Sequence, residues 1–122
     1  MILTIQTTVE ARDLRITNVS ESDNIHIIVE FEPKYQDGVK NNTVTARNLI
    51  RQSPELRQVV KDMIKPYVKQ HFEHKRDARY NYNYNVIGIY GKKVHFNMIF
   101  SYCENALENL DQFIEDVLLT IR

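Results

Sequence analysis

Basic residues recur at a helical spacing in the middle of the chain. We call this set the basic stripe; it comprises Arg57, Lys61, Lys65, Lys69, Lys75, Arg76 and Arg79. Its first four members are four residues apart and therefore lie on one face of a helix. Residues 39–79 carry a local charge of +6, although the whole chain, with 16 Lys or Arg and 16 Asp or Glu, is neutral. Such a surface suits phosphates or an acidic protein. The alternative is a solvated face.

Tyrosine and asparagine alternate from residue 80 to residue 85, directly after the basic stripe. Alternate residues of a strand share a face, so the spacing predicts an aromatic face of Tyr80, Tyr82 and Tyr84. Aromatic rings beside cations stack and steer single-stranded nucleic acids. Tyrosine also anchors protein interfaces, and such rings can instead pack under a loop or across a sheet.

Acidic residues form a matching stripe near the end of the chain: Glu104, Glu108, Asp111 and Glu115. A structural interpretation pairs this acidic stripe with the basic stripe, either within the chain or across a homodimer. Exposed pairs of this kind contribute little stability each, so they would set the orientation of the two helices.

Residues suited to catalysis or metal binding are few. Cys103 is expected in the first turn of the last helix, where the helix dipole lowers a thiol pKa, and His95 in the preceding strand is a conceivable base. The apolar stripe that follows favours a buried, inert thiol. His71 and His74 have the spacing of two metal ligands, but no second pair completes a site. We therefore predict no enzyme, no metal and no cofactor.

The first half of the chain predicts two strands. Apolar residues alternate from Leu3 to Ala11, and their phase slips near Arg12 and Asp13, which predicts a bulge or a strand end there. A second strand begins at Ile25 and ends at Pro33, where pairing stops. A loop with an Asp37-Gly38 turn follows.

Helix signals come next. A short helical piece is expected at residues 46–51, and Ser53 with Pro54 starts a longer helix as N-cap and first residue. Apolar residues at positions 56–72 follow the helical period, so one face is buried. Pro66 should kink this helix without ending it.

A hairpin and a last helix complete the pattern. Residues 84–90 and 93–100 flank Gly91, and a two-residue II′ turn there would place Tyr90 opposite Lys93. The alternation puts residues 87, 89, 94, 96, 98 and 100 on the core face. Ser101 and Glu104 have capping-box spacing, which predicts that an amphipathic helix starts there.

These elements predict an α+β fold in the order ββαββα. A four-stranded antiparallel sheet covered on one face by two main helices buries the apolar faces of all elements and leaves the other sheet face open. A length of 122 residues fits one compact domain, residues 1–122. One cysteine excludes a disulfide scaffold. The chain lacks a long apolar run and a signal-peptide pattern, which predicts no membrane span and a cytoplasmic location.

The predicted function is a non-catalytic binding or regulatory module. Its partner would be nucleic acid or an acidic protein surface, contacted by the basic stripe and the tyrosine-rich strand. The composition, with 13 Ile and 11 Asn against 4 Ala, is typical of an AT-rich genome. The alternative is therefore a small regulator or inhibitor of phage or mobile-element type, including anti-defence proteins, that binds a host protein through the tyrosine face.

Overall fold

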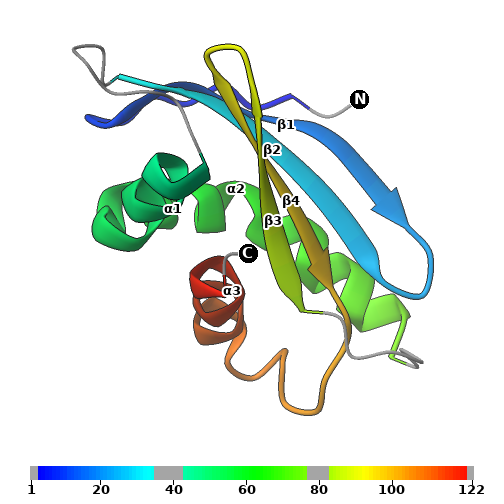
Figure 1. Ribbon diagram of the computed structural model, residues 1–122. Helices are drawn as coiled ribbons and strands as arrows, with labels where there is room; N and C mark the ends of the chain where they lie inside the picture. Colours follow the sequence, from blue (N-terminus) through cyan, green and yellow to red (C-terminus); the bar gives the residue numbers. More distant parts are fainter. Residues whose placement is uncertain (1–2, 35–42, 77–82, 121–122) are drawn as a thin grey trace.

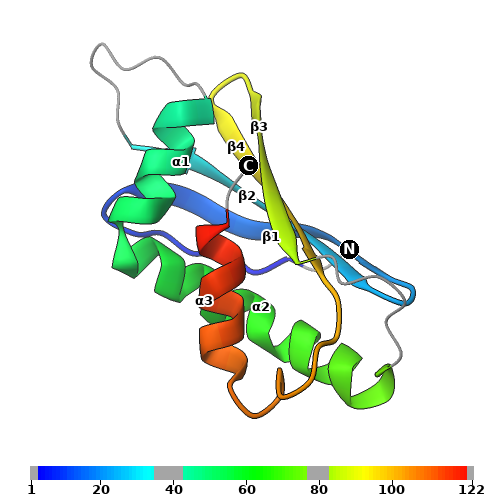
Figure 2. The same cartoon turned by 60° about the horizontal axis from the view of Figure 1, so that its bottom comes forward.

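The computed structural model describes residues 3–34, 43–76 and 83–120. Its strands are β1 (Ala11–Glu21), β2 (Ile25–Pro33), β3 (Tyr84–Tyr90) and β4 (Lys93–Phe100), and its helices are α1 (Thr43–Gln52), α2 (Pro54–His74) and α3 (Leu110–Leu119). The strands form one antiparallel sheet in the order β1-β2-β4-β3. The helices lie on one face of this sheet (Figures 1 and 2). The predicted ββαββα fold is confirmed, with α1 and α2 consecutive.

The predicted irregularity in the first strand is confirmed. The pairing of β1 with β2 shifts between Arg12 and Arg15, and Asp13 has a φ of 57°, in the left-handed region. The bulge lets Ala11 and Leu14, which have opposite parity, both reach the core.

The prediction that the first strand starts at Leu3 is wrong. β1 starts at Ala11, and the preceding residues touch it through one antiparallel bridge between Gln6 and Leu14. The side-chain oxygen of Thr8 accepts hydrogen bonds from the N–H groups of Glu10 and Ala11, which fixes a tight turn. This turn carries the preceding residues to the outer edge of β1, where their side chains reach solvent.

The predicted hairpin of β3 and β4 is confirmed in register. Tyr90 pairs with Lys93, and Gly91 has a φ of 65° while Lys92 does not adopt a positive φ, as a II′ turn requires. Side chains alternate along β4: Phe96 and Met98 are buried among the helices, whereas His95 and Asn97 lie on the opposite face, which we call the open face.

The predicted start of the long helix is also confirmed. The side-chain oxygen of Ser53 accepts a hydrogen bond of 3.1 Å from the N–H of Leu56, and Pro54 is the first helical residue. The helix continues through Pro66 to His74. Its buried apolar residues include Val60, Ile64, Val68 and Phe72, which follow the predicted face.

The prediction that the last helix starts at the capping-box residues is wrong. Residues 104–109 form turns, and α3 begins at Leu110 after Asn109. Asn105 has a φ of 69°, which a right-handed helix does not accept, so a helix cannot start until after it. α3 still buries Ile114 and Leu118, as its apolar period predicts.

One buried polar side chain joins the edge strand β3 to the end of α3. The amide nitrogen of Asn85, which is 1% exposed, donates to the carbonyl oxygens of Val117 (2.8 Å) and Leu118 (3.2 Å). The last carbonyls of a helix lack partners within it. Asn85 donates to two of these carbonyls, of which that of Val117 also accepts from Thr120.

Replacing Asn85 with Asp should destabilise the protein. The change places a carboxylate oxygen against two carbonyl oxygens in a buried site, and we expect the free energy of unfolding to fall by at least about 2 kcal/mol. Urea unfolding measures this. The matched control is Asn97→Asp on the open face, for which we expect a loss below about 1 kcal/mol; equal losses would contradict the role of Asn85.

Candidate functional site

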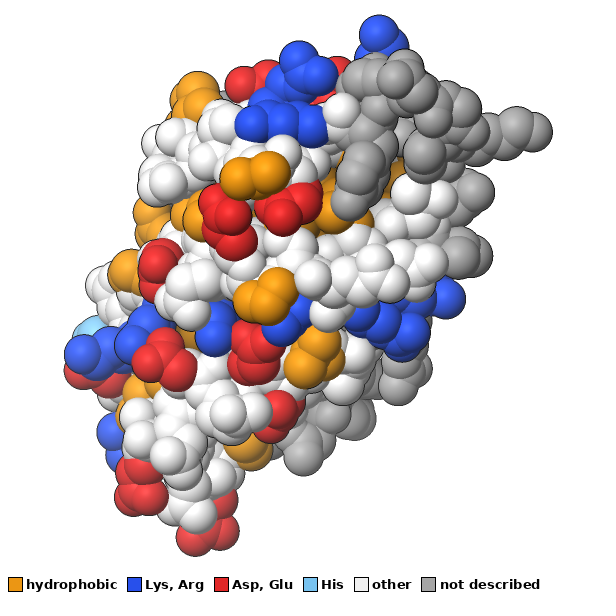
Figure 3. Space-filling model, turned by 90° about the vertical axis from the view of Figure 1, so that its left-hand side faces the viewer, with side chains coloured by type: hydrophobic (Ala, Val, Ile, Leu, Met, Phe, Trp, Pro, Cys, Tyr) orange, Lys and Arg blue, Asp and Glu red, His pale blue; other side chains and the backbone are white. Residues whose placement is uncertain are grey.

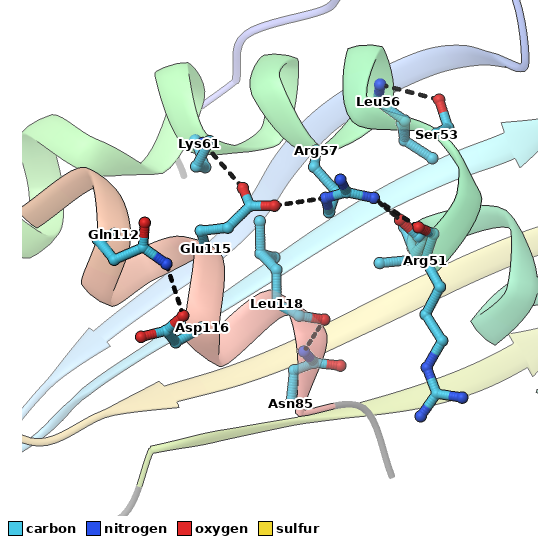
Figure 4. A network of polar contacts seen from close by, with 11 residues as sticks. Arg51, Ser53, Leu56, Arg57, Lys61, Asn85, Gln112, Glu115, Asp116 and Leu118 are labelled. Carbon is cyan, nitrogen blue, oxygen red and sulfur yellow. Dashed lines mark hydrogen bonds and ion pairs between the residues drawn. The ribbon is translucent and has the colours of Figure 1, made fainter.

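The first half of the basic stripe is paired within the chain. Cations and carboxylates are interspersed on the face drawn in Figure 3. Glu115 of α3 contacts Arg57 Nε through Oε1 at 2.6 Å and Lys61 Nζ through Oε2 at 2.8 Å (Figure 4). Lys65 Nζ lies 2.9 Å from Asp111 Oδ1. The interpretation that the acidic and basic stripes meet within the chain is confirmed for these residues.

Arg57 connects all three helices. Its Nη1 donates to the carbonyl oxygens of Ile50 and Arg51, both at 2.8 Å, at the end of α1. The side chains of Arg57 and Lys61 are each 14% exposed. Burial alone would raise the pKa of Glu115, but hydrogen bonds and charges from Lys61 and Arg57 outweigh it and hold that pKa below its ordinary value. These cations therefore have a structural role.

The other half of the basic stripe remains on the surface. Lys69, Lys75 and Arg76 are exposed near the end of α2. Lys75 Nζ lies 3.6 Å from Asp23 in the turn between β1 and β2, and the Arg76 guanidinium lies 6.0 Å from the centre of the Tyr102 ring. The predicted site residues Arg79, Tyr80 and Tyr82 lie outside the described residues. Tyr84, the remaining predicted site residue, lies on the open face of β3.

Removing the charge of Glu115 should destabilise the protein and make its free energy of unfolding less dependent on pH. Glu115→Gln leaves Arg57 and Lys61 without a counter-charge, so we expect a loss of about 1–3 kcal/mol at neutral pH. A carboxyl with a lowered folded-state pKa stabilises the fold above its ordinary pKa of 4.5, and this stabilisation is lost as the pH falls through the folded-state value.

Chemical unfolding of both proteins from about pH 7 to pH 3 measures this. The free energy of unfolding should fall more steeply for the native protein than for Glu115→Gln below about pH 5. Glu108→Gln, an exposed change in the turns before α3, is the control and should alter stability by less than about 0.5 kcal/mol. Parallel pH profiles for the native protein and Glu115→Gln would contradict the account.

A second charge cluster lies on the open face and centres on Glu30 of β2. Glu30 is 7% exposed. Its Oε1 accepts from Arg15 Nη2 (2.6 Å), Arg15 Nε (3.0 Å) and Lys93 Nζ (3.2 Å), and its Oε2 lies 2.9 Å from His95 Nε2. The residues come from β1, β2 and β4, which the sheet places side by side. We call Arg15, Glu30, Lys93 and His95 the Glu30 cluster.

The Glu30 cluster keeps an excess of positive charge. Burial would raise the pKa of Glu30, but hydrogen bonds and charges from Arg15 and Lys93 outweigh it, so the pKa lies below its ordinary value. One carboxylate thus faces two permanent cations. The Arg15 and Lys93 side chains remain 33% and 44% exposed, so a ligand can reach them.

Aromatic rings lie at both ends of this face. The Tyr90 ring, in a residue that is 64% exposed, packs beside His95 with ring centres 4.6 Å apart. At the other end, Tyr84 lines a hollow of about 490 Å³ together with His26 and Ile99. The two tyrosines are six residues apart on β3, about 20 Å by the rise of a strand.

Four residues of the open face were not predicted as site residues: Arg15, Glu30, Lys93 and Tyr90. The hairpin register already placed Tyr90 opposite Lys93, and the alternation in the second strand already separated Glu30 from the apolar positions. The missing fact was that β2 pairs with β4, which places Glu30 opposite His95. No local pattern encodes a pairing between such distant segments.

His71 and His74 do not form a pair of ligands. His71 is 4% exposed, and its ring nitrogens lie 3.1 Å from Glu21 Oε1 and 3.2 Å from the carbonyl oxygen of Asp23. His74 Nδ1 instead contacts the carbonyl oxygen of Gln70. Within residues 3–34, 43–76 and 83–120, no group of three or more His, Cys, Asp or Glu side chains is arranged to hold a metal ion.

Cys103 lies in a different environment from the one predicted. Because α3 begins at Leu110, Cys103 is not in its first turn. The residue packs against the core, whereas His95 lies on the open face and contacts Glu30. Burial raises the pKa of the Cys103 thiol, which lowers its reactivity.

Cys103 should therefore react slowly with a thiol reagent. We expect alkylation by iodoacetamide at about pH 8 to be at least about tenfold slower in the folded protein than in urea, because less thiolate forms. Mass spectrometry over time measures both rates. Equal rates would contradict the partial burial of the thiol against the core.

None of the helices in the described part of the chain is both long and apolar enough to cross a membrane. Comparisons with protein-family models, curated proteins and solved structures find no match to this chain.

Proposed function

We propose that the protein is a non-catalytic binding module that engages single-stranded nucleic acid across the open face of its sheet. The observation that carries this proposal is the Glu30 cluster, in which a buried carboxylate holds two partly exposed cations beside an exposed tyrosine. The ion pairs of Arg57, Lys61 and Lys65 with α3 favour this face over the first half of the basic stripe.

The cations of the Glu30 cluster are suited to phosphate. In the described chain, Arg15 uses Nε and Nη2 on Glu30, and Nη1 has no other contact. Lys93 donates to Glu30 through one of three N–H groups. Because Glu30 already restricts both side chains, a phosphate that binds them costs less conformational entropy than one that binds free side chains.

The rings of the open face are suited to bases. Single-stranded nucleic acids bind proteins by stacking bases on aromatic side chains while cations contact the backbone. Tyr90 with His95 provides one stacking position, and the hollow lined by Tyr84 and His26 provides a second. Tyr84 and Tyr90 are about 20 Å apart, a distance that suits a nucleic-acid strand several nucleotides long.

The exposed end of the basic stripe extends this surface. Asp23, which Lys75 approaches, lies between Ser22 and Asn24, and both of these line the hollow that contains Tyr84. A nucleic-acid strand that leaves the hollow at the β1–β2 turn would therefore approach Lys75 at the end of α2. A nucleic-acid strand on this path would contact both Tyr84 and Lys75.

Titration of fluorescent single-stranded DNA and RNA tests the proposal. Tyr90→Ala should weaken binding by about 1–3 kcal/mol through lost stacking. Lys93→Gln should weaken binding and reduce the slope of log affinity against log salt by about 0.7, the value of one phosphate contact on a single strand. Tyr90 is largely exposed, so the variant should keep the native unfolding midpoint.

Lys61→Gln is the matched control on the helical side, because its charge is already paired with Glu115. It should leave the salt slope unchanged. Two outcomes would contradict the proposal: no binding at about 50 mM salt, where phosphate contacts are strong, or binding that depends on Lys61 and not on Lys93. Binding of an acidic protein in place of either oligonucleotide would assign the surface to the other anionic partner.

A further inference from the structure

Residues 3–9, which we call the edge segment, have a strand-like sequence that the single chain does not bury. Their apolar residues alternate with polar ones, the pattern of a half-buried strand. In the structure, however, Leu3, Ile5 and Val9 are 53%, 60% and 72% exposed. These are three of the most exposed large apolar side chains of the described chain, and they occur within seven residues.

The backbone of the edge segment also has an unpaired side. Gln6 exchanges two hydrogen bonds of 2.7 Å with Leu14, so its N–H and C=O point toward β1. In an antiparallel pair the neighbouring residues point the other way, so Ile5 and Thr7 direct their N–H and C=O groups away from the sheet. Among the described residues, Ile5 and Thr7 make no backbone hydrogen bond.

The sequence of the edge segment contains none of the residues that usually protect an edge against pairing. Natural edge strands carry lysine, proline or inward-pointing charges that prevent another strand from adding to them. Residues 3–9 contain no charged residue and no proline. The bulge at Asp13 lies on β1, behind the segment, and does not cover its outer side. Figure 1 shows the dark blue segment running beside β1.

We propose that the edge segment pairs with the same segment of a second copy of this chain. The strands would run antiparallel about a twofold axis at Ile5, so Ile5 would exchange two hydrogen bonds with Ile5 of the second copy. Leu3 would lie opposite Thr7 of the second copy. This register keeps Leu3 and Ile5 of both copies on one face, where they bury each other.

A second copy fits this edge better than a charged strand does. The segment is uncharged, so two copies meet without like-charge repulsion, and inversion about Ile5 keeps the odd-numbered residues of both copies on the same face. The contact is short and smaller than a standard interface, so we expect a weak dimer that forms at high micromolar concentration.

A single cysteine at the axis tests the register. In the Cys103→Ser background, Ile5→Cys places two Cα atoms about 5.5 Å apart across the hydrogen-bonded pair, which a disulfide can bridge. Leu3→Cys is the matched control, because its two copies would lie four residues apart along the strands, about 13 Å. We expect mild oxidation to convert Ile5→Cys to a covalent dimer and to leave Leu3→Cys mainly monomeric.

Sedimentation of the native protein at up to about 0.5 mM supplies an independent readout. We expect the mass to rise from 14.5 kDa toward twice that value, and Ile5→Lys to remain a monomer with an unchanged unfolding midpoint. A native protein that stays monomeric, a dimer that persists in Ile5→Lys, or equal cross-linking of both cysteine variants would overturn the proposal. Nucleic-acid binding is tested separately by Lys93→Gln, because Lys93 lies on β4, which β2 separates from β1 and the edge segment.

Discussion

The contact of Glu115 with Arg57 and Lys61 determines which cations of the basic stripe lie between the helices. The carboxylate oxygens of Glu115 on α3 lie 2.6 Å from Arg57 Nε and 2.8 Å from Lys61 Nζ on α2. Arg57 also donates to two carbonyl oxygens in the last turn of α1. Without Glu115, two cations that are 14% exposed would lack a counter-charge. The contact therefore fixes how the helices pack and removes these cations from the outer surface.

The helices cover one face of the sheet and leave the other face open. Three helices bury one face of four strands, so every second residue of each strand is free to carry polar chemistry. On β2 and β4 this alternation brings Glu30 and His95 together, and the neighbouring strands add Arg15 and Tyr90. The Glu30 cluster thus gathers two permanent cations around one carboxylate in a chain that is neutral overall.

The sequence predicts well those features that depend on neighbouring residues. Ser53 and Pro54 marked the start of α2, Gly91 marked the turn with its register, and the phase slip at Asp13 marked the bulge. Predictions failed where a distant segment decides. The alternation from Leu3 forms a strand only where a partner strand pairs with it, and within the described chain β1 pairs with these residues at one bridge. The capping-box spacing at Ser101 did not start a helix, because Asn105 adopts a positive φ.

The features of the candidate site also divide into those that local sequence predicts and those that depend on the complete fold. The charge pattern allowed two interpretations of the basic stripe, a free surface or pairing with the acidic stripe. The packing of α2 on α3 decides for pairing at Arg57, Lys61 and Lys65. The Glu30 cluster needs the pairing of β2 with β4, which follows from the complete fold. Tyr84 was predicted on the face opposite the core, and that face is where the proposed contacts lie.

Backbone amide NMR of the folded protein, recorded during titration with a short single-stranded oligonucleotide, would show which face binds the strand. We expect chemical-shift changes to concentrate on the open-face positions 15, 30, 84, 90, 93 and 95, while positions 57, 61 and 115 between the helices change little. Changes concentrated on the exposed side of α2, with the strands unaffected, would contradict binding at the open face.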